Sequence, residues 1–188
     1  MKQKLYRLLS YILSPPAIAL YVTIVFSLYP LNPDHIDFFS SFTIGSVFLF
    51  LIPLISIFHF SRDDFDITKK EKRNKPFLIT IFSYVVSSMV FWLLDFHSMF
   101  VISMAYVFVS TATFIINIFW KISVHTAGTA GPITAIVYVF GINLVPLYLI
   151  VLLTSLIRFK VKAHNLLQII VGALSAIFIT LTVYKVLW

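Results

Sequence analysis

The chain has 188 residues, of which 60% are hydrophobic, 17% aromatic and 11% charged, and it carries a formal net charge of +7. Its mean hydropathy is +1.00. A soluble domain carries about 25% charged residues, so this apolar surplus does not fit inside one soluble core and has to face lipid. Long unbroken apolar runs exclude the alternating polarity of a membrane β-barrel. The composition therefore predicts an all-α polytopic membrane helical bundle.

The chain contains no cysteine, which excludes disulfides and thiolate metal sites. Its basic residues gather at the ends of apolar runs, a pattern that indicates membrane topology or an anionic ligand rather than nucleic acid. The N-terminal basic residues precede a long apolar run that lacks a small-x-small cleavage site, so we predict a first span and not a removed signal. Residues 1–188 are expected to form a single integral membrane domain.

Seven apolar runs follow one another along the chain, and roughly 20 residues are needed to cross a bilayer. The 32 residues from Thr126 to Ile157 are too many for one ordinary span and few for two. Because Gly141, Asn143 and Pro146 interrupt them, we predict two short helices joined near 141–143, and six to seven helices in all. The runs are Tyr11–Tyr29, Phe39–Phe60, Phe77–Leu94, Met99–Trp120, Thr126–Phe140, Leu144–Ile157 and Leu166–Trp188.

The basic residues also predict the topology. With seven segments, the N-terminus, residues 61–76, residues 121–125 and residues 158–164 fall on one side, and they hold thirteen of the fourteen Lys and Arg residues. Positive residues in short loops favour the cytoplasmic face, so we expect these segments in the cytoplasm of a prokaryotic inner or plasma membrane. His125 and His164 are then predicted to meet at the same membrane surface.

A first polar cluster holds Lys121, Ser123 and His125, just before a run that contains Gly128 and Gly131. Small residues suit a tight entry to a helix, and backbone N–H groups at a helix N-terminus bind anions. The cluster fits an anion site, and it equally fits an interfacial turn with a snorkelling lysine.

A second polar cluster holds Arg158, His164 and Gln168. On a helix, residues four apart share a face, so the histidine and the glutamine can form a hydrogen bond. An arginine offers a planar fork of donors that suits phosphate oxygens. The alternative is a positively charged anchor at the membrane surface.

A third polar cluster lies in residues 61–76, where Asp63, Asp64 and Asp66 precede several basic residues. Carboxylates followed by cations suit magnesium and a diphosphate. A solvated, self-neutralising loop explains the same residues.

The second cluster resembles a signature of a known family. Arg158, five residues, His164, three residues and Gln168 is similar to the third signature of the type 2 phosphatidic acid phosphatase superfamily, which reads Ser-Arg, five residues, His, three residues, Asp. Residues 122–125, Ile-Ser-Val-His, resemble its second signature, Pro-Ser-Gly-His. The resemblance covers a phosphatase-like core at about residues 115–188. The first signature, Lys, six residues, Arg-Pro, has only the degenerate candidate Lys-Lys-Glu-Lys-Arg-Asn-Lys-Pro at 69–76.

The resemblance implies a metal-independent phosphatase without a cofactor, acting on a lipid phosphate or an isoprenoid (di)phosphate whose tail lies in the bilayer. It implies that His164 is the nucleophile, that His125 is the general acid and that Gln168 stands in place of the aspartate behind the nucleophile. The expected phosphate ligands are Arg158, Ser123, Lys121, Lys75 and Lys69.

Two other functions fit the sequence. Gln168 lacks the charge of the family aspartate, which favours a non-catalytic lipid-binding or transport protein of the same fold. Alternatively, Asp63, Asp64 and Asp66 would hold magnesium-diphosphate in an intramembrane prenyltransferase. A chelator should stop the prenyltransferase and not the phosphatase, whereas vanadate should inhibit only the phosphatase.

Overall fold

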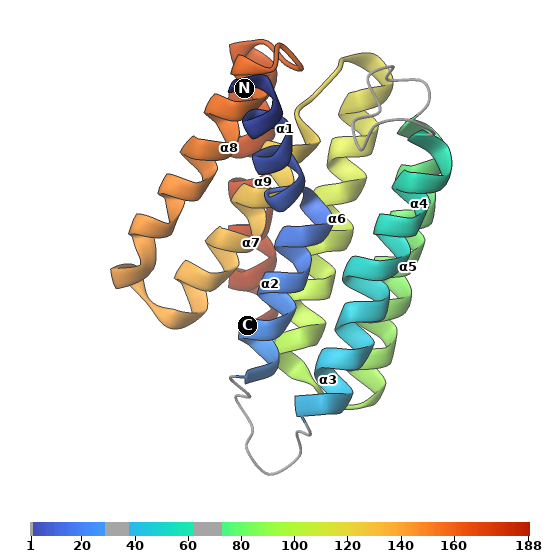
Figure 1. Ribbon diagram of the computed structural model, residues 1–188. Helices are drawn as coiled ribbons and strands as arrows, with labels where there is room; N and C mark the ends of the chain where they lie inside the picture. Colours follow the sequence, from blue (N-terminus) through green and yellow to red (C-terminus); the bar gives the residue numbers. More distant parts are fainter. Residues whose placement is uncertain (1, 29–37, 62–72) are drawn as a thin grey trace.

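The computed structural model describes residues 2–28, 38–61 and 73–188. Every regular element in these ranges is a helix, and the prediction of an all-α bundle is confirmed (Figure 1). The elements are α1 Lys2–Ile12, α2 Pro15–Leu28, α3 Phe38–Gly45, the π-helical η1 Ser46–Leu51, α4 Ile52–Ser61, α5 Asn74–Leu93, α6 His97–Phe119, α7 Val124–Phe140, the 3₁₀ helix η3 Ile142–Leu147, α8 Tyr148–Lys160 and α9 Leu166–Leu187.

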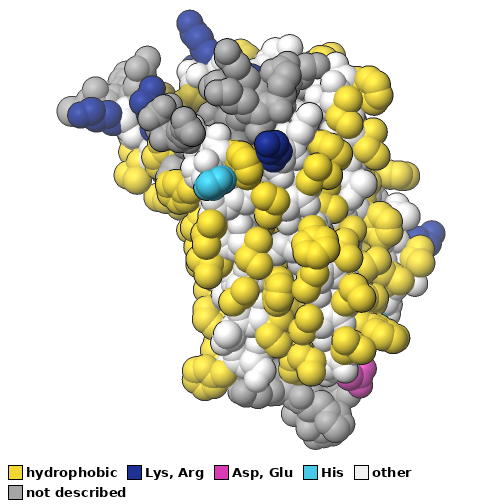
Figure 2. All heavy atoms as spheres, turned by 90° about the vertical axis from the view of Figure 1, so that its right-hand side faces the viewer, with side chains coloured by type: hydrophobic (Ala, Val, Ile, Leu, Met, Phe, Trp, Pro, Cys, Tyr) yellow, Lys and Arg dark blue, Asp and Glu magenta, His cyan; other side chains and the backbone are white. Residues whose placement is uncertain are grey.

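The helices are those of an integral membrane protein. Five helical segments are long and apolar enough to cross a bilayer, and the α1–α2 pair, bent by 42°, adds a further candidate. Figure 2 shows a broad hydrophobic band across one face of the bundle, with Lys and Arg side chains mainly near its upper end. The five segments are Phe38–Ser61, Asn74–Leu93, His97–Phe119, Ile142–Lys160 and Leu166–Leu187.

The N-terminal span differs from its prediction because the chain forms two helices there. α2 begins at Pro15, where proline suits the first turn of a helix and lacks the N–H that would continue α1. α1 exposes both Leu5 and Leu8 and the cations Lys4 and Arg7. A helix with exposed apolar and basic side chains fits the membrane interface, so α1 lies at the bundle end to which the basic segments belong.

The predicted pair of short helices between Thr126 and Ile157 is confirmed. α7 ends at Phe140, and Gly141 follows with φ 106° and ψ 163°, a left-handed backbone that favours glycine. The 3₁₀ turn η3 then leads into α8, which returns toward the end where α7 began (Figure 1).

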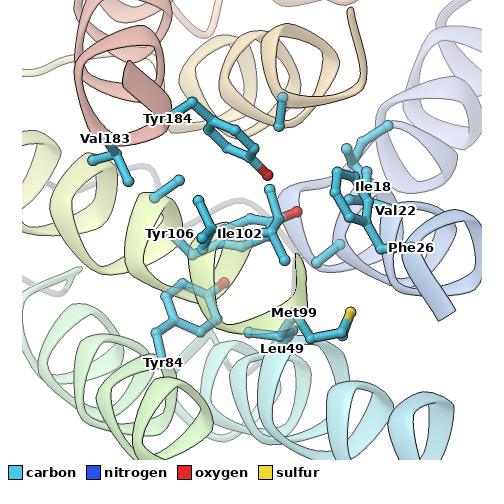
Figure 3. Close-up of a cluster of buried hydrophobic side chains, with 14 of the residues drawn as sticks. Ile18, Val22, Phe26, Leu49, Tyr84, Met99, Ile102, Tyr106, Val183 and Tyr184 are labelled. Carbon is cyan, nitrogen blue, oxygen red and sulfur yellow. The ribbon is translucent and has the colours of Figure 1, made fainter. Parts of the chain in front are cut away.

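One end of the bundle therefore collects the segments that carry most basic residues. Figure 1 places the start of α1, the end of α4, the turn between α6 and α7 and the turn between α8 and α9 at its top. His125 and His164 belong to two of these turns. Below them, α6 and α7 lie inside the bundle, and buried side chains from α2, η1, α5, α6 and α9 form its main core (Figure 3).

Candidate functional site

The turn between α8 and α9 determines how Arg158 and His164 lie relative to each other in space. After α8 ends, the N–H of Lys162 donates to the Phe159 carbonyl at 3.0 Å, and the N–H of Ala163 donates to the Arg158 carbonyl at 3.2 Å. This is the hydrogen-bond pattern of a Schellman motif. Lys162 occupies its left-handed position with φ 55°. The motif reverses the chain at once, so the histidine six residues after the arginine turns back toward it.

Residues after His164 form a capping box at the start of α9. The side chain of Asn165 accepts from the backbone N–H of Gln168 at 2.9 Å, and Oε1 of Gln168 accepts from the backbone N–H of Asn165 at 3.2 Å. The same Oε1 lies 3.1 Å from Nδ1 of His164. Because an amide oxygen only accepts, Nδ1 carries the proton. Nε2 of His164 then keeps its lone pair.

The start of α7 forms the other half of the site. Ser123 caps this helix, because its side chain accepts from the Thr126 N–H at 3.4 Å and lies 2.5 Å from the Thr126 hydroxyl. Its own N–H donates to the Gln168 carbonyl at 3.2 Å. A Cβ on Gly172 would lie 2.7 Å from the Ser123 carbonyl oxygen. Glycine at 172 thus allows α9 to touch the turn that presents His125.

Arg73 joins the site from the start of α5. Its side chain is 6% exposed, and Nη1 donates to the Ile122 carbonyl at 3.3 Å, directly before Ser123. The sequence did not single it out, because one arginine among several cations in residues 69–76 carries no distinguishing signal. Lys75, which stood where the family signature has arginine, is exposed with Nζ 6.0 Å from the ring centroid of Phe60.

A cavity of about 120 Å³ brings these parts together. Its polar end is lined by Arg73, His125 and His164, and it continues between α2, α4, α5, α6, α7 and α9 along mainly apolar side chains. Five prolines from four helices, α2, α4, α5 and α7, are among the residues that line it. They are Pro15, Pro16, Pro53, Pro76 and Pro132.

His164 is 6% exposed and lies in a positive field. Burial is the main cause that lowers its pKa from the ordinary value of 6.5 to about 3. The nearby cations Arg73, Arg158 and Lys121 lower the pKa further, and the hydrogen bond from Nδ1 to Gln168 opposes them. The imidazole is therefore neutral at pH 7, which is the state that a nucleophilic histidine requires.

The other residues predicted for the site occupy different positions around it. Lys121, which lies between α6 and α7, donates from Nζ to the Ala163 carbonyl at 2.9 Å. This hydrogen bond links the turn before α7 to the turn before His164. Arg158 is 1% exposed, and its Nη1 donates to the Ser10 hydroxyl of α1 at 2.8 Å. It acts on His164 through charge, and the cavity lining contains Arg73 and not Arg158.

Ser123 also lies outside the cavity lining, and its hydroxyl serves as the helix cap described above. Lys69, Asp63, Asp64 and Asp66 lie outside the described residues. Ser10 is a second residue that the sequence analysis missed, since a serine in a basic N-terminal segment gives no sign of a contact 148 residues away. Among the residues described, no group of three or more His, Asp or Glu side chains is placed to hold a metal ion.

Comparison of the chain with protein-family models, with curated proteins and with solved structures gives no match.

Proposed function

We propose that the chain is an integral membrane phosphatase that hydrolyses a lipid phosphate or an isoprenoid (di)phosphate through a phosphohistidine intermediate. One observation carries the proposal: His164, His125 and Arg73 line the polar end of one cavity whose remaining walls are mainly apolar. Two imidazoles and a guanidinium are groups that suit a phosphate, and the apolar walls suit an attached hydrocarbon tail. The resemblance to the type 2 phosphatidic acid phosphatases supports the same reaction.

The reaction follows from the neutral state of His164 and from the position of His125 beside it in the cavity lining. Nε2 of His164 attacks phosphorus, the bond from phosphorus to the lipid oxygen breaks, and His125 donates a proton to the leaving oxygen. A water molecule then attacks the phosphohistidine, His125 takes the proton of that water, and the phosphorus–nitrogen bond breaks to release phosphate. Gln168 holds Nδ1–H of His164 throughout, so Nε2 remains directed to the phosphorus.

The cations around the cavity supply the charge that such a transition state needs. Arg73 reaches the polar end of the cavity directly, while Arg158 and Lys121 lie close enough to lower the pKa of His164. Fixed positive groups in a site of low water content stabilise the phosphoryl oxygens more strongly than they would in water. The basic end of the bundle is proposed to face the cytoplasm.

Phosphate release by the purified protein tests the proposal. We expect the wild type to release phosphate from a diacylglycerol phosphate or a polyprenyl diphosphate with and without EDTA, and vanadate to inhibit it. His164→Ala should abolish release, and His125→Ala should reduce it strongly. His59→Ala is the matched control, since His59 is exposed on α4 and does not line the cavity. Wild-type turnover in His164→Ala would contradict the proposal, and loss of activity with EDTA would favour the prenyltransferase.

A lipid-phosphate-binding protein without turnover is the second candidate. Gln168 favours it, because a neutral amide does not stabilise the positive charge that His164 acquires on attack. Binding of a lipid phosphate that depends on Arg73, together with no phosphate release from any substrate, would identify this function.

A further inference from the structure

Helix α1 exposes an apolar face and a basic face side by side. Leu5, Leu8 and Ile12 follow one another at spacings of three and four residues, so they lie on one face of the helix. Their side chains are 54%, 55% and 43% exposed. Lys4 and Arg7, which are also exposed, lie three residues apart and form the neighbouring face. This arrangement suits a helix whose apolar side chains contact lipid tails while its cations reach the headgroups.

The third face of α1 is joined to the candidate site. The hydroxyl of Ser10 accepts the 2.8 Å hydrogen bond from Nη1 of Arg158, and both side chains are buried. The charge of Arg158 acts in turn on His164. Directly after α1, Ser14 and Pro15 line the same cavity as His164. A displacement of α1 would therefore change both the arginine near the nucleophile and one wall of the cavity.

The exposed cations of α1 lie close to this contact and nearer the end of the bundle (Figure 1). Arg7 and Lys4 come three and six residues before Ser10, which places them roughly 4.5 Å and 9 Å from it along the helix axis. Lys160 and Lys162 are exposed at the end of α8 and in the turn that follows. Because α1 packs against α8, these four cations form one surface, the α1 basic surface.

The described part of the protein offers no carboxylate side chain to the α1 basic surface. Residues 2–28, 38–61 and 73–188 contain one acidic side chain, that of Asp95, and it lies between α5 and α6 at the opposite end of the bundle. A soluble anion would match the cations and leave the apolar face of α1 in water. Anionic lipids combine negative headgroups with hydrocarbon, so they match both faces.

We infer that the α1 basic surface binds anionic headgroups of the surrounding leaflet, and that this binding regulates the candidate site by holding Ser10 against Arg158. The binding is independent of the proposed function, whereas the regulation rests on it. In a bilayer without anionic lipid, α1 loses the attraction between its cations and the headgroups. The contact between Ser10 and Arg158 then opens more often, and Arg158 is held less firmly near His164. Phosphate release should therefore rise with the anionic fraction of the leaflet.

Thermal unfolding of His164→Ala in lipid nanodiscs tests the binding without turnover. The discs contain phosphatidylcholine alone, or phosphatidylcholine mixed with phosphatidylglycerol of the same acyl chains. We expect the mixed disc to raise the melting temperature by roughly 4 °C, and high salt to remove most of this increase by screening. Adding Lys4→Gln and Arg7→Gln together should remove most of it as well. Lys185→Gln is the control, since Lys185 is exposed at the far end of α9 and should leave the increase unchanged.

Phosphate release by the protein with His164 intact tests the regulation in the same discs. We expect release by the wild type to be about fivefold faster in the mixed disc. Ser10→Ala should keep the lipid-dependent increase in melting temperature and lose the lipid-dependent increase in release, because the cations remain and the contact with Arg158 is gone. Ser10→Thr retains a hydroxyl and should restore the response of release. The double variant Lys4→Gln and Arg7→Gln, which leaves Ser10 in place, should lose both responses.

These results separate the inference from the proposed function. If the melting temperature depends on anionic lipid and on Lys4 and Arg7, but the wild type releases no phosphate in any disc, the headgroup surface stands and the phosphatase fails. Equal melting temperatures in the two discs, or an increase that the double variant retains, would show that α1 does not bind anionic headgroups. Release that rises equally in the wild type and in Ser10→Ala would show that the regulation does not pass through Arg158.

Discussion

The Nδ1 atom of His164 lies 3.1 Å from Oε1 of Gln168, and that same oxygen also accepts the backbone N–H of Asn165. One neutral amide thus completes the N-terminal cap of α9 and sets the tautomer of the histidine. In the family that the motif resembles, this position carries an aspartate. Gln168 lacks the negative charge of that aspartate, and its side-chain oxygen accepts a second hydrogen bond. The consequences of that exchange are measurable.

Gln168→Glu should raise the pKa of His164, because a carboxylate stabilises the imidazolium that burial and three nearby cations disfavour. Glutamate keeps the length needed to reach the N–H of Asn165, whereas Gln168→Asp is one methylene shorter. We expect the acid limb of the kcat/KM profile to move to higher pH in Gln168→Glu, and phosphate release at pH 7 to be retained or increased. An inactive Gln168→Glu variant that still melts like the wild type would show that the amide itself is required.

The pKa of His164 also predicts how stability depends on pH. Its folded pKa of about 3 lies below the ordinary 6.5 of an unfolded chain. Between these values the unfolded state binds more protons, so the free energy of unfolding falls as pH decreases from about 6.5 toward 3. His164→Gln should show a smaller decrease in melting temperature between pH 7 and pH 4 than the wild type. Equal decreases in both proteins would rule out a depressed pKa at His164.

Ser10→Ala should destabilise the protein by roughly 1.5–3 kcal/mol, because it removes the acceptor of a buried, charged hydrogen bond from Arg158. The melting temperature in detergent measures this effect. Ser155→Ala is the matched control, since its hydroxyl donates to the Val151 carbonyl within α8 and its loss should change little. A Ser10→Ala variant as stable as Ser155→Ala would show that α1 does not depend on this contact.

Lys162→Gly should stabilise the protein by about 1 kcal/mol, because Lys162 has φ 55° and glycine adopts this backbone without the steric penalty of a Cβ. Lys160→Gly, two residues earlier, should destabilise the protein by roughly 1 kcal/mol, since Lys160 is the last residue of a regular α-helix. Thermal unfolding of the two variants is the measurement. Destabilisation by both would mean that the left-handed turn does not form.

Local signals predicted much of this fold. The break at Gly141 was visible because glycine and proline interrupt a run that is too long for one span, and the basic segments indicated which turns share an end. The hydrogen bond between His164 and Gln168 was predicted from their spacing, whereas the capping box that Gln168 forms with Asn165 was not. These features are predictable because each depends on neighbouring residues of the chain.

Contacts between distant segments were not predictable in the same way. Arg73 reaches the turn at Ile122, and Ser10 reaches Arg158, through packing of separate helices. Nothing in the local sequence distinguishes Arg73 from the lysines beside it. Pro15 and Pro16 indicate that α1 is a separate helix. The apolar run that follows them, however, does not show at which residue the membrane span begins.

The short hairpin of α7 and α8 has a consequence for the surrounding bilayer. α7 has 17 residues and spans about 25 Å, less than the roughly 30 Å of a hydrocarbon core, whereas η3 and α8 together form the 19-residue segment Ile142–Lys160, which is long enough to cross it. Figure 1 shows their turn ending short of the lower ends of α2 and α3. Leu149, Leu152 and Leu156 of α8 face outward. Because this turn ends short of the neighbouring helices, we expect the bilayer to thin locally along this flank, and this hydrophobic mismatch should favour membranes with shorter acyl chains.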